Sequence, residues 1–208
     1  FRLSEHLERL NKSLAAIRLP NPNTYDQWCE ILKQLVEKNG GGHLSVYLQV
    51  TRGVAGKRDH CYSVAIKPTV FAMAAPMLTA ASEDVAHASG EKAITADDIR
   101  WKRCDIKSIS LLPNILLKQQ AQDAGAVEAI LLRDGFVTEG SASNVFIVKD
   151  GMLWTPLKDN KLLGGITRDL IIELVQFSKL PFLFSSNNHV SATPFSFKSI
   201  YNSPSSDL

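Results

Sequence analysis

Hydrophobic residues recur at helical spacing in two stretches near the start of the chain. Residues 4–18 carry a leucine or isoleucine at every third or fourth position, and residues 24–38 repeat this pattern around Trp28. Such spacing places the apolar side chains on one face of an α-helix. We therefore predict two amphipathic helices, the first with Ser4 as its N-cap and the second ending before three consecutive glycines.

Alternating and β-branched stretches follow, separated by turn-forming residues. The patterns predict strands over residues 43–51, 67–76, 92–99, 128–132, 145–149 and 152–155, and helices over residues 111–124 and 167–176. The dipeptides Asp134-Gly135 and Asp150-Gly151 are typical of β-hairpin turns. Helices mixed with hairpins favour an α+β fold over a doubly wound parallel sheet.

A polar stretch rich in alanine, serine and glycine divides the chain. We predict a small N-terminal α/β domain over residues 1–82, a linker over 83–91 and a larger C-terminal domain over 92–208. The end of the chain, residues 181–208, is atypical. From residue 185 onward it is rich in serine, asparagine and proline and has no clear periodicity, so no element is predicted there.

Composition narrows the class of protein. The chain has 208 residues, of which 45% are hydrophobic and 21% charged, as in a globular protein with a real core. A formal net charge of +2 gives no electrostatic case for nucleic acid or an anionic membrane, and no apolar run has the ~18 residues of a membrane span. Three scattered cysteines without metal or redox spacing indicate free thiols in a reducing cytoplasm.

Two segments carry groups with chemical potential. Lys107 lies in the run WKRCDIKS over residues 101–108, and Glu139 lies in the run VTEGSASN over residues 137–144. Taken singly, such residues are usually a solvated surface lysine and a turn carboxylate. Together, an amine that can form an imine and a carboxylate that can keep a pyridine nitrogen protonated are what pyridoxal phosphate asks of a protein.

The run WKRCDIKS, with LLPN after it, resembles the Schiff-base segment of the fold-type IV pyridoxal phosphate enzymes. The runs VTEGSASN and LLGGITRD resemble two further motifs of that class, in the family's order, which argues against coincidence. The class includes D-amino acid aminotransferases, branched-chain aminotransferases and aminodeoxychorismate lyases. The D-amino acid aminotransferases are the branch most similar to this chain, and the resemblance covers roughly residues 1–180.

The resemblance implies a cofactor, pyridoxal phosphate, and a role for each matching residue. Lys107 would form the Schiff base and later move the proton between the substrate Cα and the cofactor. Glu139 would bond the pyridine nitrogen, and Leu163 would pack on the ring. Phosphate would sit at a helix start, where backbone N–H groups favour an anion. The further cofactor contacts implied are Arg9, Ser143, Gly165, Ile166 and Thr167, while Ala142 stands where the family often has serine.

The resemblance also implies how substrates are held. Arg58 and His60 match the pair that grips the substrate carboxylate in the D-amino acid branch, from a loop that reaches the neighbouring subunit of a homodimer. The expected reaction transfers the amino group of D-alanine to 2-oxoglutarate, giving pyruvate and D-glutamate. Branched-chain aminotransferase and aminodeoxychorismate lyase remain alternatives. So does an inactive fragment, because the family's N-terminal strands and a late Ser/Thr cluster are not found in this sequence.

Overall fold

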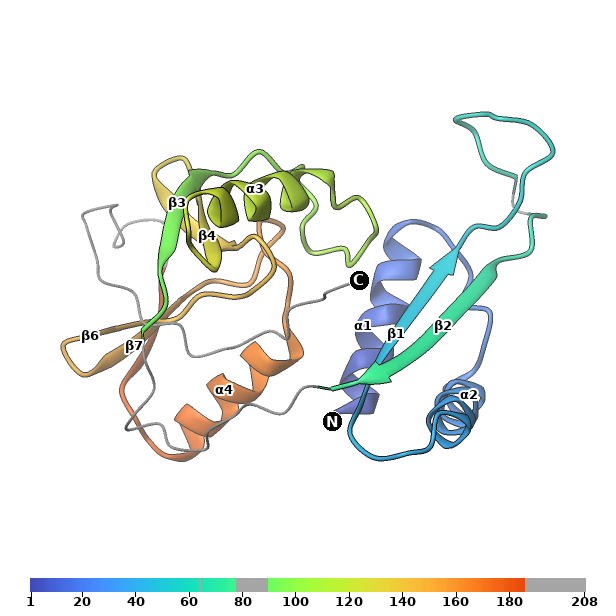
Figure 1. The fold of residues 1–208 in the computed structure, drawn as a ribbon, viewed down its shortest axis with the longest axis horizontal. Helices are drawn as coiled ribbons and strands as arrows, with labels where there is room; N and C mark the ends of the chain where they lie inside the picture. Colours follow the sequence, from blue (N-terminus) through green and yellow to red (C-terminus); the bar gives the residue numbers. More distant parts are fainter. Residues whose placement is uncertain (64, 78–89, 186–208) are drawn as a thin grey trace. The chain divides into compact units, whose positions relative to one another are not determined.

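The computed structural model describes residues 1–63, 65–77 and 90–185. The chain divides into two compact units, Phe1–Ala80 and Ala81–Leu208 (Figure 1). The predicted linker, 83–91, and the serine-rich end after residue 185 lie almost wholly outside the described residues. The predicted boundaries at residues 82 and 92 therefore stay predictions.

The first unit consists of two helices and a β-hairpin-like pair of strands. Its elements are α1 (Leu3–Ala16), α2 (Tyr25–Lys38), β1 (Leu44–Thr51) and β2 (Thr69–Pro76). β1 and β2 pair antiparallel along their whole length, from Leu44 opposite Pro76 to Thr51 opposite Thr69. All four elements confirm the sequence patterns to within two residues at each end.

The starts of the two helices differ from each other. Thr24 caps α2 in a capping box, because its hydroxyl accepts from the Gln27 N–H while the Gln27 side chain accepts from the Thr24 N–H. Ser4 is not the N-cap of α1, so that prediction is wrong. The helix already begins at Leu3 with Arg2 as its N-cap, and the Ser4 hydroxyl donates to the carboxylate of Glu5 at 2.6 Å.

The second unit combines two three-stranded sheets, among the described residues, with two helices (Figure 1). In chain order its elements are β3 (Ala93–Asp97), α3 (Leu112–Asp123), β4 (Glu128–Arg133), β5 (Phe136–Gly140), β6 (Ile147–Lys149), β7 (Met152–Pro156), α4 (Ile166–Phe177) and β8 (Phe182–Ser185). The sheet orders are β3-β4-β5 and β6-β7-β8, each with one parallel and one antiparallel pair. The α+β prediction is confirmed.

Two strands, β5 and β8, escaped the sequence patterns. β5 holds five residues, ends in glycine and includes a threonine and a glutamate, so it shows no clean alternation. β8 has only four residues. Neither run alternates between apolar and polar residues, so no strand period can be read from it.

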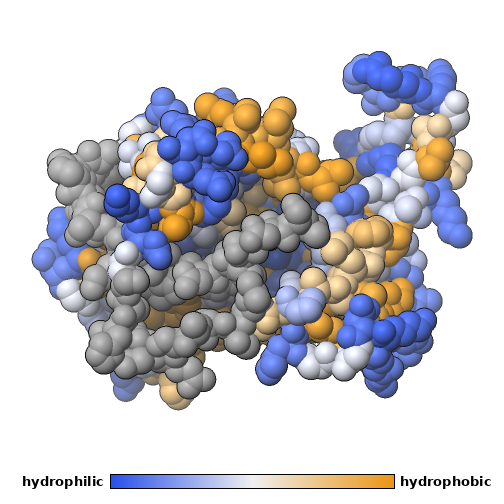
Figure 2. Space-filling view, viewed as in Figure 1, coloured by the Kyte–Doolittle hydropathy of each residue, from blue (hydrophilic) through white to orange (hydrophobic). Residues whose placement is uncertain are grey.

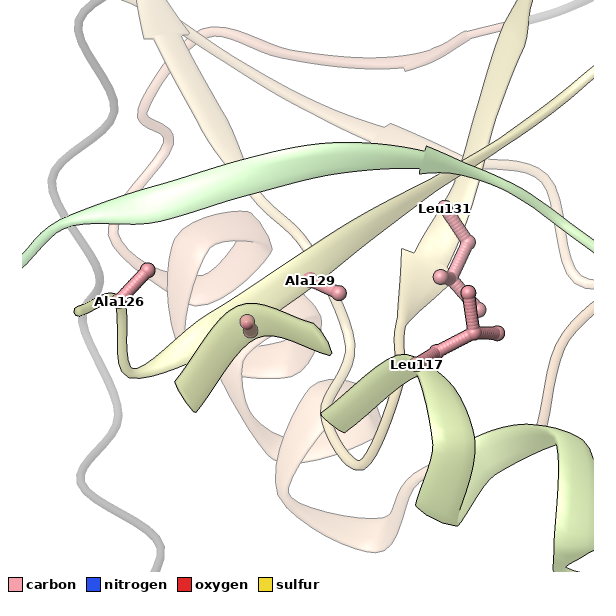
Figure 3. Close-up of a cluster of buried hydrophobic side chains, with 5 residues drawn as sticks. Leu117, Ala126, Ala129 and Leu131 are labelled. Atoms are coloured by element: carbon pink, nitrogen blue, oxygen red, sulfur yellow. The ribbon is translucent and has the colours of Figure 1, made fainter. Parts of the chain in front are cut away.

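A small core fixes helix α3 to the sheet that carries β5. Leu117 and Ala121 of α3 are buried against Ala129 and Leu131 of β4, with Ala126 beside them. The Leu117 and Leu131 side chains point toward each other (Figure 3). The small alanine side chains let the helix and the sheet pack closely, and this packing holds β4, the partner of β5, against α3.

The outer side of α3 is apolar as well. Leu112, Ile115 and Leu116 are exposed, and hydrophobic residues gather over this helix in Figure 2.

Among the described residues, no helix is both long enough and apolar enough to cross a bilayer.

Candidate active site

Glu139 lies at an irregularity in the pairing of β4 with β5. Leu132 pairs with Val137 and Ile130 with Gly140, so two steps along β4 match three steps along β5. The extra residue is a β-bulge, which redirects side chains locally. Thr138 and Glu139, neighbours that would face opposite sides of a regular strand, are both buried here, and Arg100 donates to both.

The Glu139 carboxylate is held from three directions. The Arg100 guanidinium donates to Oε1, while Oε2 accepts from Asn144 Nδ2 and from the Leu163 N–H, each at 3.0 Å. Only 5% of the residue is exposed. Burial raises the pKa of Glu139 above its ordinary value, although Arg100 and the Leu163 N–H act in the opposite direction.

Behind Glu139, Arg100 forms a fork with Asp98. Arg100 Nε donates to Oδ1 at 2.8 Å and Nη2 donates to Oδ2 at 2.9 Å, a bidentate geometry that is stronger than a single contact. Arg133 Nη2 reaches the same carboxylate at 3.0 Å, and the Thr138 hydroxyl donates to it at 3.0 Å. Two arginines thus face two carboxylates, so this buried group has no formal net charge.

The electrostatics of Asp98 follow from these partners. Burial by itself would raise the pKa of Asp98, but hydrogen bonds and charge from Arg100, together with the charge of Arg133, outweigh it and lower the pKa. The guanidinium of Arg100 is stabilised in return, because Asp98 and Glu139 raise its pKa despite its burial. Asp98 is therefore ionised beside Arg100, and Arg100 in turn places a positive charge beside Glu139.

The turn after β5 is organised by a second carboxylate, Glu128. Its Oε1 accepts from the Ser141 N–H at 3.1 Å and from the Ser141 hydroxyl, and its Oε2 accepts from the Ser143 hydroxyl at 2.8 Å. Asn114 Nδ2 of α3 donates to the Ser141 carbonyl at 2.7 Å. Because the Ser143 proton is directed at Glu128, the Ser143 hydroxyl can meet a further group only as an acceptor.

Helix α4 begins close to this turn. Its N-cap, Gly165, offers no side chain, and a Cβ at that position would lie 2.1 Å from Asn144 Oδ1. The same Asn144 donates to Glu139 and to the Leu163 carbonyl. The first backbone N–H groups of a helix have no intrahelical acceptor, so Ile166 and Thr167 present donors suited to an anion.

The segment with Lys107 is anchored on both sides of that residue. The Cys104 N–H donates to the Asn160 carbonyl at 2.9 Å, and Asn160 Nδ2 donates to the Lys102 carbonyl at 2.8 Å. Further along, Asn114 holds the serine turn. Lys107 follows Cys104 by three residues, so its Cα lies within about 11 Å of the Cys104 Cα. The Lys107 side chain is exposed.

A model of the amino-transferase class IV family matches residues 1–183. The chain belongs to this family. The family assignment confirms the resemblance that the three sequence motifs indicated.

Several curated relatives of this class IV chain are D-alanine aminotransferases. The protein from Listeria monocytogenes serotype 1/2a (strain 10403S) is 45% identical over 186 residues, which make up 87% of this chain and 62% of the relative. The protein from Bacillus licheniformis is 44% identical over 176 residues, 85% of this chain and 61% of the relative. The chain thus spans about three fifths of the length of the curated relatives that it matches.

Solved structures similar to this class IV chain include other transaminases. The branched-chain amino acid aminotransferase of Escherichia coli superposes with a TM-score of 0.72 at 26% identity, covering 88% of this chain and 60% of the other. A fold IV transaminase of Curtobacterium pusillum gives a TM-score of 0.69 at 26% identity, covering 88% and 62%. These neighbours establish the fold-type IV architecture.

The structure brings together only part of the site that the motifs predict. Glu139 and the Leu163 backbone are in direct contact, and Asn144 joins both to Gly165. Ser143 closes the turn that begins at Gly140, whose N–H donates to the Ser143 carbonyl at 2.7 Å. The roles of these residues in cofactor binding stay predictions.

Three predicted residues lie in the first unit. Arg9 is a half-buried residue of α1, and Arg58 and His60 are exposed in the loop between β1 and β2. Within that loop Asp59 accepts from the Cys61 N–H at 3.1 Å and pairs with Lys57 at 3.2 Å. The binding roles of Arg9, Arg58 and His60 remain predictions.

Five residues that support the site were not singled out from the sequence: Asp98, Arg100 and Arg133 of the buried group, Glu128 of the turn after β5, and Asn144. Asn144 was visible as the last letter of a family motif. Asp98 and Arg100 follow strand β3 two residues apart, which places both side chains on the same side of an extended segment. Glu128 opens β4 and carries no local signal, because its partners are 13 to 15 residues away along the chain.

Proposed function

We propose that this chain carries the pyridoxal phosphate site of an aminotransferase for D-amino acids, with D-alanine as donor and 2-oxoglutarate as acceptor. The protein would act as a cytoplasmic homodimer on small amino acids and 2-oxo acids. The curated relatives support the D-amino acid assignment, since they are D-alanine aminotransferases at 37–45% identity. The observation that carries the proposal is the buried, three-sided clamp on Glu139.

The residues present fit the cofactor. A carboxylate offers about four lone-pair positions, and the clamp uses three, so Glu139 keeps one for a ring N–H. Arg100 favours the ionised form of Glu139, and a positive ring nitrogen would do so further. The uncapped start of α4 supplies backbone donors for a phosphate, and Gly165 lets Asn144, which also holds Glu139, lie against this helix start. When bound, pyridoxal phosphate supplies an electron sink for the substrate's Cα.

The other predicted residues have distinct tasks in this proposal. Lys107 would hold the cofactor through its amine, and the same amine would move the proton at the substrate Cα. Leu163 would contact the ring, and Ser143, Ile166 and Thr167 would meet polar groups of the cofactor. For Arg9 the family resemblance implies a contact with the phosphate. Arg58 and His60 hold the substrate carboxylate, a task for which the planar guanidinium is suited.

A second candidate is a branched-chain aminotransferase. Solved branched-chain enzymes share this fold at 26–27% identity. Aminodeoxychorismate lyase is another alternative. A putative 4-amino-4-deoxychorismate lyase of Legionella pneumophila shares the fold. The substrate-holding loop, rather than the buried clamp, separates these activities.

The test combines cofactor binding with a comparison of donors. Added pyridoxal phosphate is expected to give a visible absorbance band that Lys107→Ala abolishes and that Lys102→Ala, an exposed lysine five residues away, retains. Turnover with 2-oxoglutarate should then be seen with D-alanine. Turnover with L-leucine alone would overturn the D-specific assignment. No band at saturating cofactor would show instead that the chain does not hold the cofactor.

A further inference from the structure

Arg52 joins the loop after β1 to the end of helix α1. Its Nη2 donates to the Ile17 carbonyl at 2.6 Å and its Nη1 donates to the Arg18 carbonyl at 3.1 Å. Ile17 is the C-cap of α1, where the last carbonyls lack intrahelical donors and carry the negative end of the helix dipole. Helix α1 has no basic residue of its own in its last turn, so Arg52 supplies the missing cation.

The same guanidinium covers an aromatic ring from the other end of the loop. Arg52 Cζ lies 3.7 Å from the centroid of the Tyr62 ring, well within the range of a cation–π contact. Residues 53–61 lie between these two partners. One side chain therefore fixes both ends of a nine-residue loop and ties them to α1.

Gly53 sets the direction in which the loop leaves β1. Its φ is +98°, which side chains disfavour, and a Cβ there would lie 2.1 Å from the Lys67 carbonyl oxygen. The backbone thus passes closely against the segment that leads into β2. Beyond Gly53, Arg58 and His60 are exposed. The hydrogen bond from the Cys61 N–H to Asp59 lies within the loop, whereas the contacts of Arg52 join the loop ends to α1.

We propose that Arg52 is a positioning residue that clasps Tyr62 to the end of helix α1 and so holds Arg58 and His60 in place for a substrate carboxylate. This inference rests on the proposed function for its substrate, although the clasp itself does not. A loop fixed at both ends has less conformational entropy to lose when its arginine and histidine meet an anion. Loosening the clasp should weaken substrate binding without altering the chemical step.

Native-state trypsin digestion of the 208-residue chain tests the clasp without any need for turnover. Cleavage after Lys57, in the middle of the loop, is expected to rise about tenfold in Tyr62→Ala and in Arg52→Lys, because each loses the planar stacked pair. Tyr62→Phe keeps the ring and should cleave like the parent chain. Arg2→Lys, an arginine at the opposite end of α1 paired with Glu5, is the matched control. Cleavage after Lys38 serves as the internal reference.

Two results would overturn the proposal. One is unchanged cleavage after Lys57 in both Tyr62→Ala and Arg52→Lys. The other is an equal rise after Lys38, which would mean general unfolding. In the active enzyme, Tyr62→Ala should raise the KM for D-alanine about tenfold while kcat changes less than about threefold. An unaltered KM beside faster cleavage would overturn the substrate role. A chain without turnover would count against the proposed function, and the digestion would still decide the clasp.

Discussion

At the scale of single residues, the buried charge group behind Glu139 is the feature that most constrains the site. Asp98, Arg100 and Arg133 form a chain of ion pairs whose members are almost fully withdrawn from water. Such groups are retained only when every charge has a partner, since a lone buried charge is costly. These ion pairs therefore link the ionisation of Glu139, through Arg100, to Asp98.

Replacing Asp98 by asparagine should destabilise the fold in a pH-dependent way. The variant leaves Arg100 and Arg133 short of a counter-charge, and removing one partner of such a buried pair costs about 3 kcal/mol. The folded pKa of Asp98 lies below its ordinary 3.8, so its stabilisation is fully present above that value and is lost as pH falls through the folded pKa. Urea unfolding of both chains from about pH 7 to about pH 3 measures this.

The difference in unfolding free energy between the parent chain and Asp98→Asn should shrink as the pH falls below 3.8. Glu139, with its raised pKa, gives the opposite trend, and Asp98 is one cause of that raised pKa, so the comparison is made in a Glu139→Gln background in which only Asp98 differs. A difference that stays constant to the acid limit would contradict the proposed role of Asp98 as an ionised partner.

Motifs revealed the residues with chemical roles but not those that support them. Glu139 and Gly165 stand in short runs whose order along the chain is specific. Arg100 and Glu128 find partners 13 or more residues away, and one of these contacts depends on a β-bulge. No periodicity encodes a bulge, so the burial of Thr138 and Glu139 side by side could not be derived from the pattern.

At the scale of elements, helix starts show how a local rule succeeds or fails. Thr24 and Ser4 both precede amphipathic runs, yet only Thr24 caps its helix. Thr24→Ala should lower the free energy of unfolding by about 1 kcal/mol, because it leaves a first-turn N–H unpaired. Ser4→Ala, the matched control, should change it by less than about 0.5 kcal/mol. Urea unfolding followed by circular dichroism compares the two, and equal losses would refute this assignment of caps.

All four helices were predictable from the sequence, whereas two of the strands were not. Helices α1, α2, α3 and α4 each run for 12 residues or more, enough for an apolar face to repeat. Strands β5 and β8, with five and four residues, gave no usable period. β5 carries Glu139, so the element most important to the site was among the least visible in the sequence.

At the scale of the whole molecule, the chain has the architecture of its family. It spans 62% of the length of its relative from Listeria monocytogenes. Family membership and the buried clamp together support the proposed cofactor, while the residues proposed to hold the substrate, Arg58 and His60, lie in an exposed loop. Surface loops carry fewer constraints than buried groups, which is why substrate is harder to derive than cofactor.

The most direct test of the central claim is borohydride reduction of the chain in the presence of pyridoxal phosphate, followed by peptide mass mapping. Reduction makes the bond between a lysine amine and the cofactor permanent, so the modified residue can be located. The account predicts a single labelled site at Lys107, lost in Lys107→Ala and kept in Lys102→Ala. Label spread over exposed lysines such as Lys102 and Lys158, or no label at Lys107, would contradict it.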